Sequence, residues 1–231
     1  SSGAMFTTEV KRGLIDHVPE LAIADILGST EGGMGQSIMT KDTPASETAK
    51  FTLLPVAKVL VPDGSREVVP GSGEVGMVAQ GGMVPLGYYK DPEKSAKTFK
   101  EVDGKRYAFI GDMATVEADG TINLLGRGSN CINTGGEKVF PEEVEEALKL
   151  HADVADALVF GLEDERFGNR VAGVVSLEQG GSAEAEDILE ATRKLLASYK
   201  LPKDLLVVPV VPRAPNGKAD YKTAKSMMTG D

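Results

Sequence analysis

The first fifth of the chain combines a helical pattern with one continuous apolar run. Apolar residues recur at the spacing of a helix face between Thr7, which can cap a helix, and Pro19, which ends it. Residues 21–27 are almost all apolar and end at Gly28, a pattern typical of a strand buried on both faces of a parallel sheet. The remaining sequence does not supply the parallel neighbours that such a strand needs, so we expect the sequence to begin within a larger domain. The face of the expected helix consists of Val10, Leu14 and Ile15.

The middle of the chain alternates short β-rich stretches with turn signals. Asp91 and Pro92 have the residue types of a helix cap and a first helical position. The sequence Ala-Asp-Gly at residues 118–120 is a hairpin signal between two such stretches. The stretches themselves are residues 51–61, 66–69, 74–80, 106–110, 113–117 and 121–125. Together they predict an antiparallel, barrel-like subdomain.

From Arg127 onward the pattern becomes α+β. Pro141 begins one helix, whose early carboxylates favour the positive end of the helix dipole, and Ser182 can cap a second. The expected buried stripes are Val144, Ala147 and Leu148 in the first helix, and Ile188, Leu189, Thr192, Leu195, Leu196 and Tyr199 in the second. Strands are expected at residues 155–162, 171–177 and 205–211, followed by a polar tail.

The segment Gly-Arg-Gly-Ser-Asn, residues 126–130, has the composition of a flexible link. We therefore expect one domain over residues 1–126 and a second over residues 127–231. The fold class is then a mixture of α/β and α+β.

Composition and charge narrow the classes of function. The chain carries 25 Lys and Arg against 35 Asp and Glu, a net charge of −10, which repels the phosphate backbone of nucleic acids. One cysteine excludes an internal disulfide, and together with two histidines it cannot form a zinc finger. No apolar run approaches the roughly 18 residues of a membrane span. We expect a soluble, cytoplasmic protein.

Several glycine-rich loops invite a phosphate-binding interpretation, and two of them do not support it. Gly217 and Lys218 are not part of a P-loop, because Pro212 and Ala219 stand where that motif needs glycine and a hydroxyl residue. The Gly-Ser-Gly at residues 71–73 has no helix behind it, which favours a plain turn.

Three other segments carry candidate chemistry. Residues 28–33 follow the apolar run and offer a hydroxyl and a carboxylate, either as a ligand loop or as an ordinary polar turn. Asp112 and Arg127 can bind ribose hydroxyls and a phosphate, or they can be surface charges paired with each other or with water. In residues 212–218 an Asn-Gly turn projects Lys218, either as a reactive group or as a solvated lysine.

In this order the segments resemble the motifs of the adenylate-forming superfamily, which contains acyl-CoA synthetases, luciferases and peptide-synthetase adenylation domains. Residues 27–31 resemble its aromatic-Gly-x-Thr-Glu motif, and Tyr107 followed by Gly111 and Asp112 resembles its Tyr-x-x-Gly-Asp motif. Residues 126–145 resemble its hinge motif, and residues 212–218 its C-terminal lysine motif. The sequence Gly-Glu-Lys-Val-Phe-Pro-Glu-Glu-Val-Glu is most similar to that of bacterial fatty-acyl-CoA synthetases.

The resemblance implies a fold and a reaction. The fold would be the end of a large N-terminal domain with a β-barrel-like subdomain, followed by a small mobile α+β domain. The reaction would join a carboxylic, most simply fatty, acid to ATP as acyl-AMP with Mg²⁺ as cofactor, and would then transfer the acyl group to coenzyme A as co-substrate, releasing AMP. Peripheral contact with a membrane would suit an apolar substrate.

The resemblance also implies roles for individual residues. Thr30 would hold the α-phosphate region, Glu31 would coordinate Mg²⁺, and Lys218 would contact the carboxylate and the α-phosphate. Asp112 would bind the ribose hydroxyls, with Leu124 packing on the sugar and Arg127 reaching ribose or phosphate. The remaining nucleotide-binding positions would be Gly3, Ala4, Leu27, Gly28 and Ser29, where Leu27 replaces the aromatic residue that faces adenine. Asn130 would be the hinge, and the path of pantetheine would be lined by Gly135 and Gly136.

One part of the family pattern is missing. The Ser/Thr/Gly-rich loop that grips the β- and γ-phosphates is not in this sequence, and we therefore expect the C-terminal part of a longer enzyme that does not activate acids by itself. Two alternatives are an adenylation domain that loads a carrier protein and a non-catalytic module that binds AMP or CoA.

Overall fold

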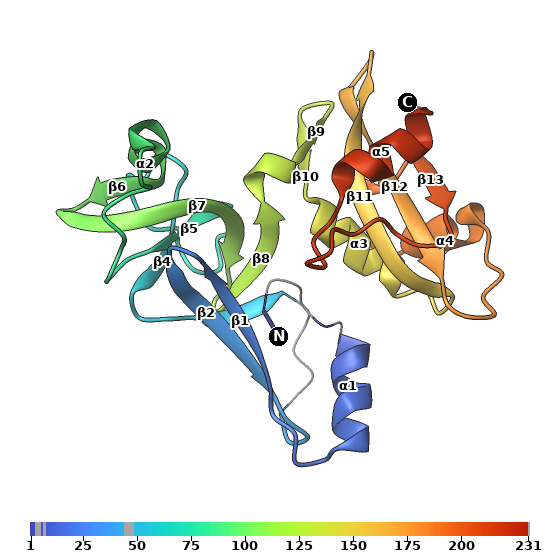
Figure 1. The fold of residues 1–231 in the computed structure, drawn as a ribbon, viewed down its shortest axis with the longest axis horizontal. Coiled ribbons are helices and arrows are strands. Elements are labelled where there is room, and N and C mark those ends of the chain that lie inside the picture. The colour runs from blue at the N-terminus through green and yellow to red at the C-terminus, as the bar shows by residue number, and fades with distance from the viewer. Residues whose placement is uncertain (3–5, 7, 44–48, 231) are drawn as a thin grey trace. The chain divides into compact units, whose positions relative to one another are not determined.

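The computed structural model describes residues 1–2, 6, 8–43 and 49–230. The expected helix cap Thr7 and the expected nucleotide-binding residues Gly3 and Ala4 lie outside the described residues. The Cα positions divide the chain into two compact units, unit 1 (Ser1–Leu125) and unit 2 (Gly126–Asp231), which are described one at a time (Figure 1).

Unit 1 is built on one open, mainly antiparallel sheet. The strands follow the order β1-β2-β3-β8-β7-β5-β4, and β6 pairs with β7. Among the described residues β1 and β4 lie at opposite ends of that order, so the sheet does not close and the expected barrel-like form is wrong. The elements are α1 (Thr8–His17), β1 (Ile23–Ser29), β2 (Gly32–Met39), β3 (Lys50–Leu53), β4 (Ala57–Leu60), β5 (Gly76–Gln80), α2 (Pro92–Thr98), β6 (Phe99–Val102), β7 (Lys105–Val116) and β8 (Ile122–Arg127).

The apolar run that opens the chain is not a strand buried on both faces. It forms β1, which pairs antiparallel with β2 through a two-residue turn at Thr30 and Glu31. Its side chains alternate, so that Leu27 is buried whereas Ile26 is 44% exposed. The only parallel contact of β1 among the described residues is a bridge between Ser2 and Ile26. The composition of the run concealed this period-2 alternation, because apolar residues occupy both faces.

Helix α1 buries a different face from the one expected. Val10 and Leu14 are exposed, whereas Ile15 is buried together with Lys11. Lys11 forms an ion pair with Asp25 of β1, and both side chains are almost completely buried. A buried lysine is tolerated only when a partner compensates its charge, so the ion pair fixes which face of α1 meets β1.

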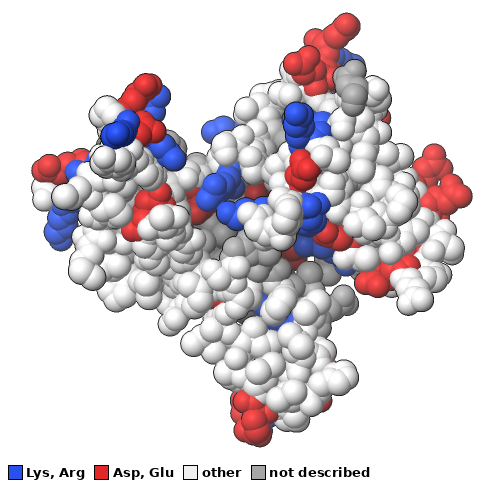
Figure 2. Space-filling model, in the orientation of Figure 1, with Lys and Arg blue, Asp and Glu red and all other residues white. Residues whose placement is uncertain are grey.

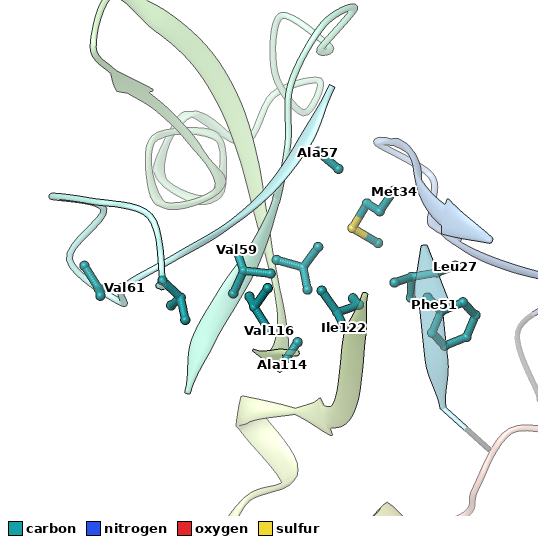
Figure 3. Close-up of a cluster of buried hydrophobic side chains, with 11 residues drawn as sticks. Leu27, Met34, Phe51, Ala57, Val59, Val61, Ala114, Val116 and Ile122 are labelled. Atoms are coloured by element: carbon teal, nitrogen blue, oxygen red, sulfur yellow. The ribbon is translucent and has the colours of Figure 1, made fainter. Parts of the chain in front are cut away.

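The core of unit 1 lies between the strands (Figure 3). Met34, Val78, Ala114 and Ile122 are completely buried there, on four different strands. Figure 3 shows Leu27, Met34 and Phe51 grouped on one side of this cluster and Val59, Val116 and Ile122 nearer its middle. Apolar burial from β1, β2, β3, β4, β5, β7 and β8 therefore stabilises the sheet as one body.

Two local predictions in unit 1 are confirmed. The Asp91 side chain accepts a hydrogen bond of 3.0 Å from Lys94 N, with Pro92 as the first residue of α2. Between β7 and β8, the Glu117 N–H donates to Thr121 O at 2.8 Å, and Gly120 takes a positive φ of 82°. Only glycine adopts that angle without cost, which is why the hairpin signal was readable.

Unit 2 is a five-stranded sheet with helices on both faces. The strand order is β10-β9-β12-β11, and β13 runs parallel to β12. Side chains alternate along β11: Ala157 and Val159 pack with α3 and α4, whereas Leu158 and Phe160 pack with α5. The elements are η1 (Gly128–Asn130), β9 (Ile132–Thr134), β10 (Glu137–Val139), α3 (Pro141–Lys149), β11 (Val154–Asp164), β12 (Gly168–Leu177), α4 (Ala185–Thr192), η2 (Ser198–Lys200), β13 (Asp204–Val207) and α5 (Tyr221–Thr229).

The mixed α/β and α+β fold class is confirmed, and the first helix of unit 2 is as expected. Pro141 begins α3, and its predicted stripe of Val144, Ala147 and Leu148 is buried. The strands expected at residues 155–162 and 171–177 lie within β11 and β12.

Two predictions for the second helix of unit 2, its cap and its length, are wrong. Helix α4 begins at Ala185, three residues after Ser182, and is capped by Glu184 in a reciprocal pair with Asp187. The helix ends at Thr192, which leaves Leu195 and Tyr199 exposed. The expected polar tail contains α5, which buries Ala224 and begins at a cap made by Asp220.

The remaining features concern apolar helices and surface charge. In the part of the chain that the structure describes, no helix has the length and apolar character needed to cross a membrane. Figure 2 shows acidic and basic side chains scattered among uncharged ones over the visible face of each unit.

We predict that Leu148→Ala destabilises unit 2 by about 2–5 kcal/mol, because Leu148 is completely buried between α3 and the sheet and its loss leaves a cavity. Leu150→Ala is the matched control. Leu150 lies two residues further on and is 66% exposed, so its loss should change stability by less than about 0.5 kcal/mol. Native-state hydrogen exchange of the β11 amides measures both values, and equal effects of the two substitutions would contradict the prediction.

Candidate functional site

The segment expected to bind phosphate is the tight turn between β1 and β2. The Glu31 N–H donates to Ser29 Oγ at 3.1 Å, which fixes the backbone of the turn. Gly32 follows with a φ of 147°, and a Cβ at that position would lie 2.7 Å from Gln80 Oε1. Close approach of β5 therefore requires glycine at residue 32. Thr30 is exposed at the tip and Glu31 is half-buried.

The Glu31 carboxylate is held by a residue far away in the sequence. The Tyr88 hydroxyl donates a hydrogen bond to Glu31 Oε1. Partial burial acts to raise the pKa of Glu31, but hydrogen bonds from Ser29 and Tyr88 and the charge of Lys94 outweigh it and lower the pKa below its ordinary value. Glu31 is therefore ionised at neutral pH, with its orientation fixed by Tyr88.

Tyr88 is itself fixed on three sides. Its N–H donates to Ser95 Oγ at 2.7 Å, and its ring centroid lies 5.3 Å from that of Phe99. The Lys94 Nζ atom lies 4.3 Å from the centre of the Tyr88 ring. Sequence reasoning missed Tyr88. The only local signal was its position just before the cap of α2, and its neighbour Tyr89 is 89% exposed.

Asp112 does not follow a strand end, as the sequence suggested, but lies within the long strand β7. Met77 pairs with Met113 and Ala79 pairs with Phe109, so three residues of β7 face one residue of β5. This bulge contains Asp112 and Gly111, whose φ is 94°. Glycine usually interrupts a strand, and the expected stretch ends at residue 110, but here Gly111 only kinks β7. Bulges of this kind redirect a side chain, and Asp112 is buried at this one.

The two leucines expected near the nucleotide belong to the core. Leu27 is 7% exposed and packs in the cluster of Figure 3, and Leu124 packs against the same cluster from β8. Gly28 lies at an irregularity in the β1–β2 register. Contacts of these residues with a nucleotide remain predictions.

In unit 2 the expected hinge residue lies in a short 3-10 helix. Arg127 ends β8, and η1 then runs to Asn130, whose Nδ2 donates to the Tyr221 hydroxyl at 3.4 Å. Burial raises the pKa of Tyr221, so its hydroxyl stays protonated. A groove of about 220 Å³ adjoins this contact, with Asn130, Cys131, Phe160, Asn169, Tyr221 and Lys225 among its lining residues. Burial also raises the pKa of the Cys131 thiol.

Gly135 and Gly136 form the two-residue turn of the β9–β10 hairpin. Both have positive φ, 59° and 92°, as a tight hairpin turn requires. The Gly135 N–H donates to Phe167 O at 3.0 Å, and a Cβ on Gly135 would lie 3.1 Å from the Phe167 ring. The hairpin tip is therefore packed directly on Phe167.

Two cationic side chains lie near the Phe167 ring. The Lys203 Nζ atom is 3.8 Å from the ring centroid, and the Arg166 guanidinium carbon is 5.0 Å from it. An aromatic face with two adjacent positive charges suits a planar base that carries phosphate groups. Sequence reasoning did not identify this cluster, because Lys203 is 36 residues from Phe167.

Lys218 is exposed in a small hairpin between β13 and α5. The Ala214 N–H donates to Lys218 O at 2.8 Å, the Gly217 N–H donates to Ala214 O at 2.8 Å, and the Lys218 N–H donates to Asn216 Oδ1 at 3.2 Å. The Asn-Gly turn expected from the sequence is therefore present, with Lys218 directly after it.

The two units thus place different candidate residues. Unit 1 holds Thr30 and Glu31 in the β1–β2 turn and Asp112 in the bulge of β7. Unit 2 holds Asn130 in η1, Gly135 in the β9–β10 turn and Lys218 after the Asn-Gly turn. Among the described residues no three acidic, histidine or cysteine side chains converge on a metal site. Glu31 and the Thr30 hydroxyl nevertheless supply the hard oxygen donors that Mg²⁺ prefers, and Mg²⁺ often takes a single protein carboxylate when phosphates complete its coordination.

Residues 143–218 match the AMP-binding enzyme C-terminal domain. The chain is similar to 3-oxocholest-4-en-26-oate–CoA ligase from Rhodococcus rhodochrous, with 46% sequence identity. The match covers 97% of this chain and 40% of that enzyme. It is also 46% identical to the medium/long-chain-fatty-acid–CoA/3-oxocholest-4-en-26-oate–CoA ligase of Mycolicibacterium smegmatis. That match covers 98% of this chain and 41% of the ligase.

Solved structures give the same relationship. The crystal structure of ATP-bound MatB from Rhodopseudomonas palustris is 26% identical and has a TM-score of 0.82, over 96% of this chain and 44% of that one. The chain therefore spans about two fifths of the length of the curated relatives.

Buried Glu145 makes the stability of unit 2 depend on pH. Burial and the neighbouring Glu142 raise its pKa to about 7, against a hydrogen bond from Val159 N and the charges of Lys149 and Arg213, which lower it. The folded chain therefore keeps a proton that the unfolded chain loses above about pH 4.5. Stability should fall as pH rises through this interval and stay level above pH 7.

We predict that Glu145→Gln removes this fall, because glutamine keeps an oxygen for Val159 N and carries no charge. Urea denaturation at pH 5 and at pH 8 gives the difference in unfolding free energy between variant and parent. From pH 5 to pH 8 this difference should shift by up to about 3 kcal/mol in favour of the variant. Glu186→Gln, at an exposed position of α4, should show no such change. The prediction would be contradicted if the difference in unfolding free energy between Glu145→Gln and the parent were the same at pH 5 and at pH 8.

Proposed function

We propose that the chain is the C-terminal part of an ATP-dependent acid–CoA ligase. The complete enzyme would form acyl-AMP and pyrophosphate from an acid and ATP, and would then convert acyl-AMP and CoA into acyl-CoA and AMP. The observation that carries the proposal is the placement of Lys218 at the tip of an ordered hairpin within the AMP-binding enzyme C-terminal domain.

The first half-reaction brings like charges together. A carboxylate must attack the α-phosphate of ATP, and both groups are anionic. A cation placed at that point stabilises the charge that the transition state concentrates there. Lys218 has the charge, the exposure and the short tether of the 214–218 turn that this task needs.

Unit 1 supplies the complementary groups. Thr30 would donate its hydroxyl to the α-phosphate region, and Glu31 would hold Mg²⁺ with its carboxylate. When bound, Mg²⁺ neutralises phosphate charge and orients the leaving pyrophosphate. Asp112, directed by the β7 bulge, would accept hydrogen bonds from the ribose hydroxyls, with Leu124 below the sugar and Arg127 near ribose or phosphate.

In the second half-reaction the CoA thiol must reach the acyl group of acyl-AMP, so this step needs an open path for CoA. Gly135 and Gly136 have no side chains to obstruct a pantetheine arm, and their turn packs on Phe167. The ring of Phe167, with Lys203 and Arg166 beside it, would receive the adenine and phosphates of CoA. Movement of unit 2 about Asn130 would withdraw Lys218 after adenylation and bring this hairpin into place.

The names of the relatives support an apolar acid as the substrate. They include ligases of medium- and long-chain fatty acids and of a sterol-derived acid. We propose an acid of this class, with a carboxylate at one end of a large apolar body. ATP and CoA are the other substrates, and the enzyme acts in the cytoplasm or at a membrane surface.

We predict that Lys218→Ala, in the complete gene product, lowers the rate of acyl-AMP formation by about 10²–10³-fold, because the attacking carboxylate loses its counter-charge. Thioester formation from supplied acyl-AMP should stay within twofold of the parent rate. Acid-dependent exchange of labelled pyrophosphate into ATP measures the first step, and release of AMP with CoA measures the second. Lys222→Ala, at an exposed lysine of α5, is the control, and equal loss of both half-reactions would contradict this role.

We also predict that Tyr88→Phe raises the Mg²⁺ concentration needed for half-maximal adenylation several-fold, because the variant leaves Glu31 Oε1 without its donor. Binding of Mn²⁺ with a non-hydrolysable ATP analogue, followed by electron paramagnetic resonance, should weaken to the same extent. Tyr89→Phe changes the adjacent, exposed tyrosine and should have no effect. Weakened Mn²⁺ binding in both variants, or in neither, would show that Tyr88 does not hold Glu31 for the metal.

A further inference from the structure

The hairpin that carries Lys218 has few contacts of its own. Its strands meet in one bridge, between Arg213 and Ala219, and the Asp220 N–H donates to Pro212 O at 3.2 Å just outside that bridge. Lys218 and the turn residues Pro215, Asn216 and Gly217 are exposed. The direction in which this hairpin projects therefore depends on what holds its base.

Arg213 joins the base of the hairpin to the sheet. Its Nε atom donates to Asp156 Oδ2 at 2.9 Å, and its Nη2 atom donates to Asp156 Oδ1 at 2.7 Å. The same Nη2 atom lies 3.4 Å from Ala157 O, a backbone acceptor of β11. Two parallel hydrogen bonds to a carboxylate fix the orientation of the guanidinium as well as its distance.

The partner strand is suited to this task because β11 is an edge strand. It pairs with β12 on one side, and side chains cover its other edge. Asp156 Oδ1 accepts from Ala157 N at 2.9 Å, and Glu145 Oε1 accepts from Val159 N at 2.9 Å. With Arg213 at Ala157 O, three side chains occupy the positions that a neighbouring strand would fill. The hairpin is thereby tied to a strand of the unit 2 sheet.

We propose that Arg213 is a positioning residue for Lys218, and that its paired contact with Asp156 sets the direction of the hairpin so that the lysine reaches the reacting carboxylate and α-phosphate. This inference rests on the proposed function of Lys218. Arg213 itself touches no reacting group. Its effect should therefore fall on the half-reaction that uses Lys218 and not on the other.

The first test measures both half-reactions in the complete gene product. Arg213→Gln and Asp156→Asn should each lower adenylation about 10–100-fold, the scale expected for a misplacement of about 1 Å, and leave thioester formation from supplied acyl-AMP within twofold. Arg213→Lys keeps the charge but not the paired geometry, and should recover part of the rate.

The chain offers a matched control in a second arginine–aspartate pair. Arg170 Nε lies 2.5 Å from Asp204 Oδ2, with side chains exposed to a similar degree, but this pair joins β12 to the start of β13. Arg170→Gln should leave both half-reactions near the parent values. Equal losses from Arg170→Gln and Arg213→Gln would show that any broken ion pair in unit 2 has this effect and would overturn the proposal.

A second test does not depend on the reaction. Trypsin cleaves after lysine in flexible segments, so the rate of cleavage between Lys218 and Ala219 reports how firmly the hairpin is held. Arg213→Gln and Asp156→Asn should increase this rate several-fold over the parent and over Arg170→Gln. Unchanged cleavage in both variants would overturn the anchoring role even if activity fell.

The two tests also separate this inference from the proposed function. If Lys218→Ala left adenylation intact, the proposed function would fail, and the positioning role would fail with it although cleavage after Lys218 still responded to Arg213. If Lys218→Ala abolished adenylation and Arg213→Gln did not reduce it, the proposed function would stand and only the positioning role would be overturned.

Discussion

Backbone groups at the open edge of β11 must find hydrogen-bond partners, and most of unit 2 is organised by the side chains that supply them. Glu145 reaches this edge from α3, Asp156 turns back from the strand itself, and Arg213 arrives from the segment before α5. The bonds of Glu145 and Arg213 join two other segments to this strand. Because an unpaired buried amide or carbonyl costs about as much as a lost hydrogen bond, the positions of α3 and of the Lys218 hairpin follow from one requirement.

A second regularity is that the candidate chemistry lies on hairpin turns and on a bulge, while the sheets provide the support. Thr30 and Glu31 form the β1–β2 turn, Gly135 and Gly136 form the β9–β10 turn, and Lys218 follows an Asn-Gly turn. Short turns project a few atoms at a fixed angle from a rigid base. Reactants can then be held closely by groups that are themselves well ordered.

The sequence predicted those features that depend on neighbouring residues. The Asp91–Pro92 helix start, the Ala-Asp-Gly hairpin and the α3 stripe are confirmed because capping, positive φ and helical period are local. Residues distant in sequence decided the rest. Lys11 selects the buried face of α1 through Asp25, and Tyr88 meets Glu31 from 57 residues away. Helix α5 did carry readable signals, an aspartate cap and Gly230 in the left-handed conformation, which the polar composition of the segment obscured.

The single cysteine of the chain has a consequence for the chemistry of the proposed hinge. Cys131 follows η1 directly, and burial keeps its thiol protonated at neutral pH. Oxidants and alkylating agents react with the thiolate, so this thiol is a slow target even though it adjoins a groove. The proposed hinge segment is thereby protected from covalent modification at its adjoining thiol.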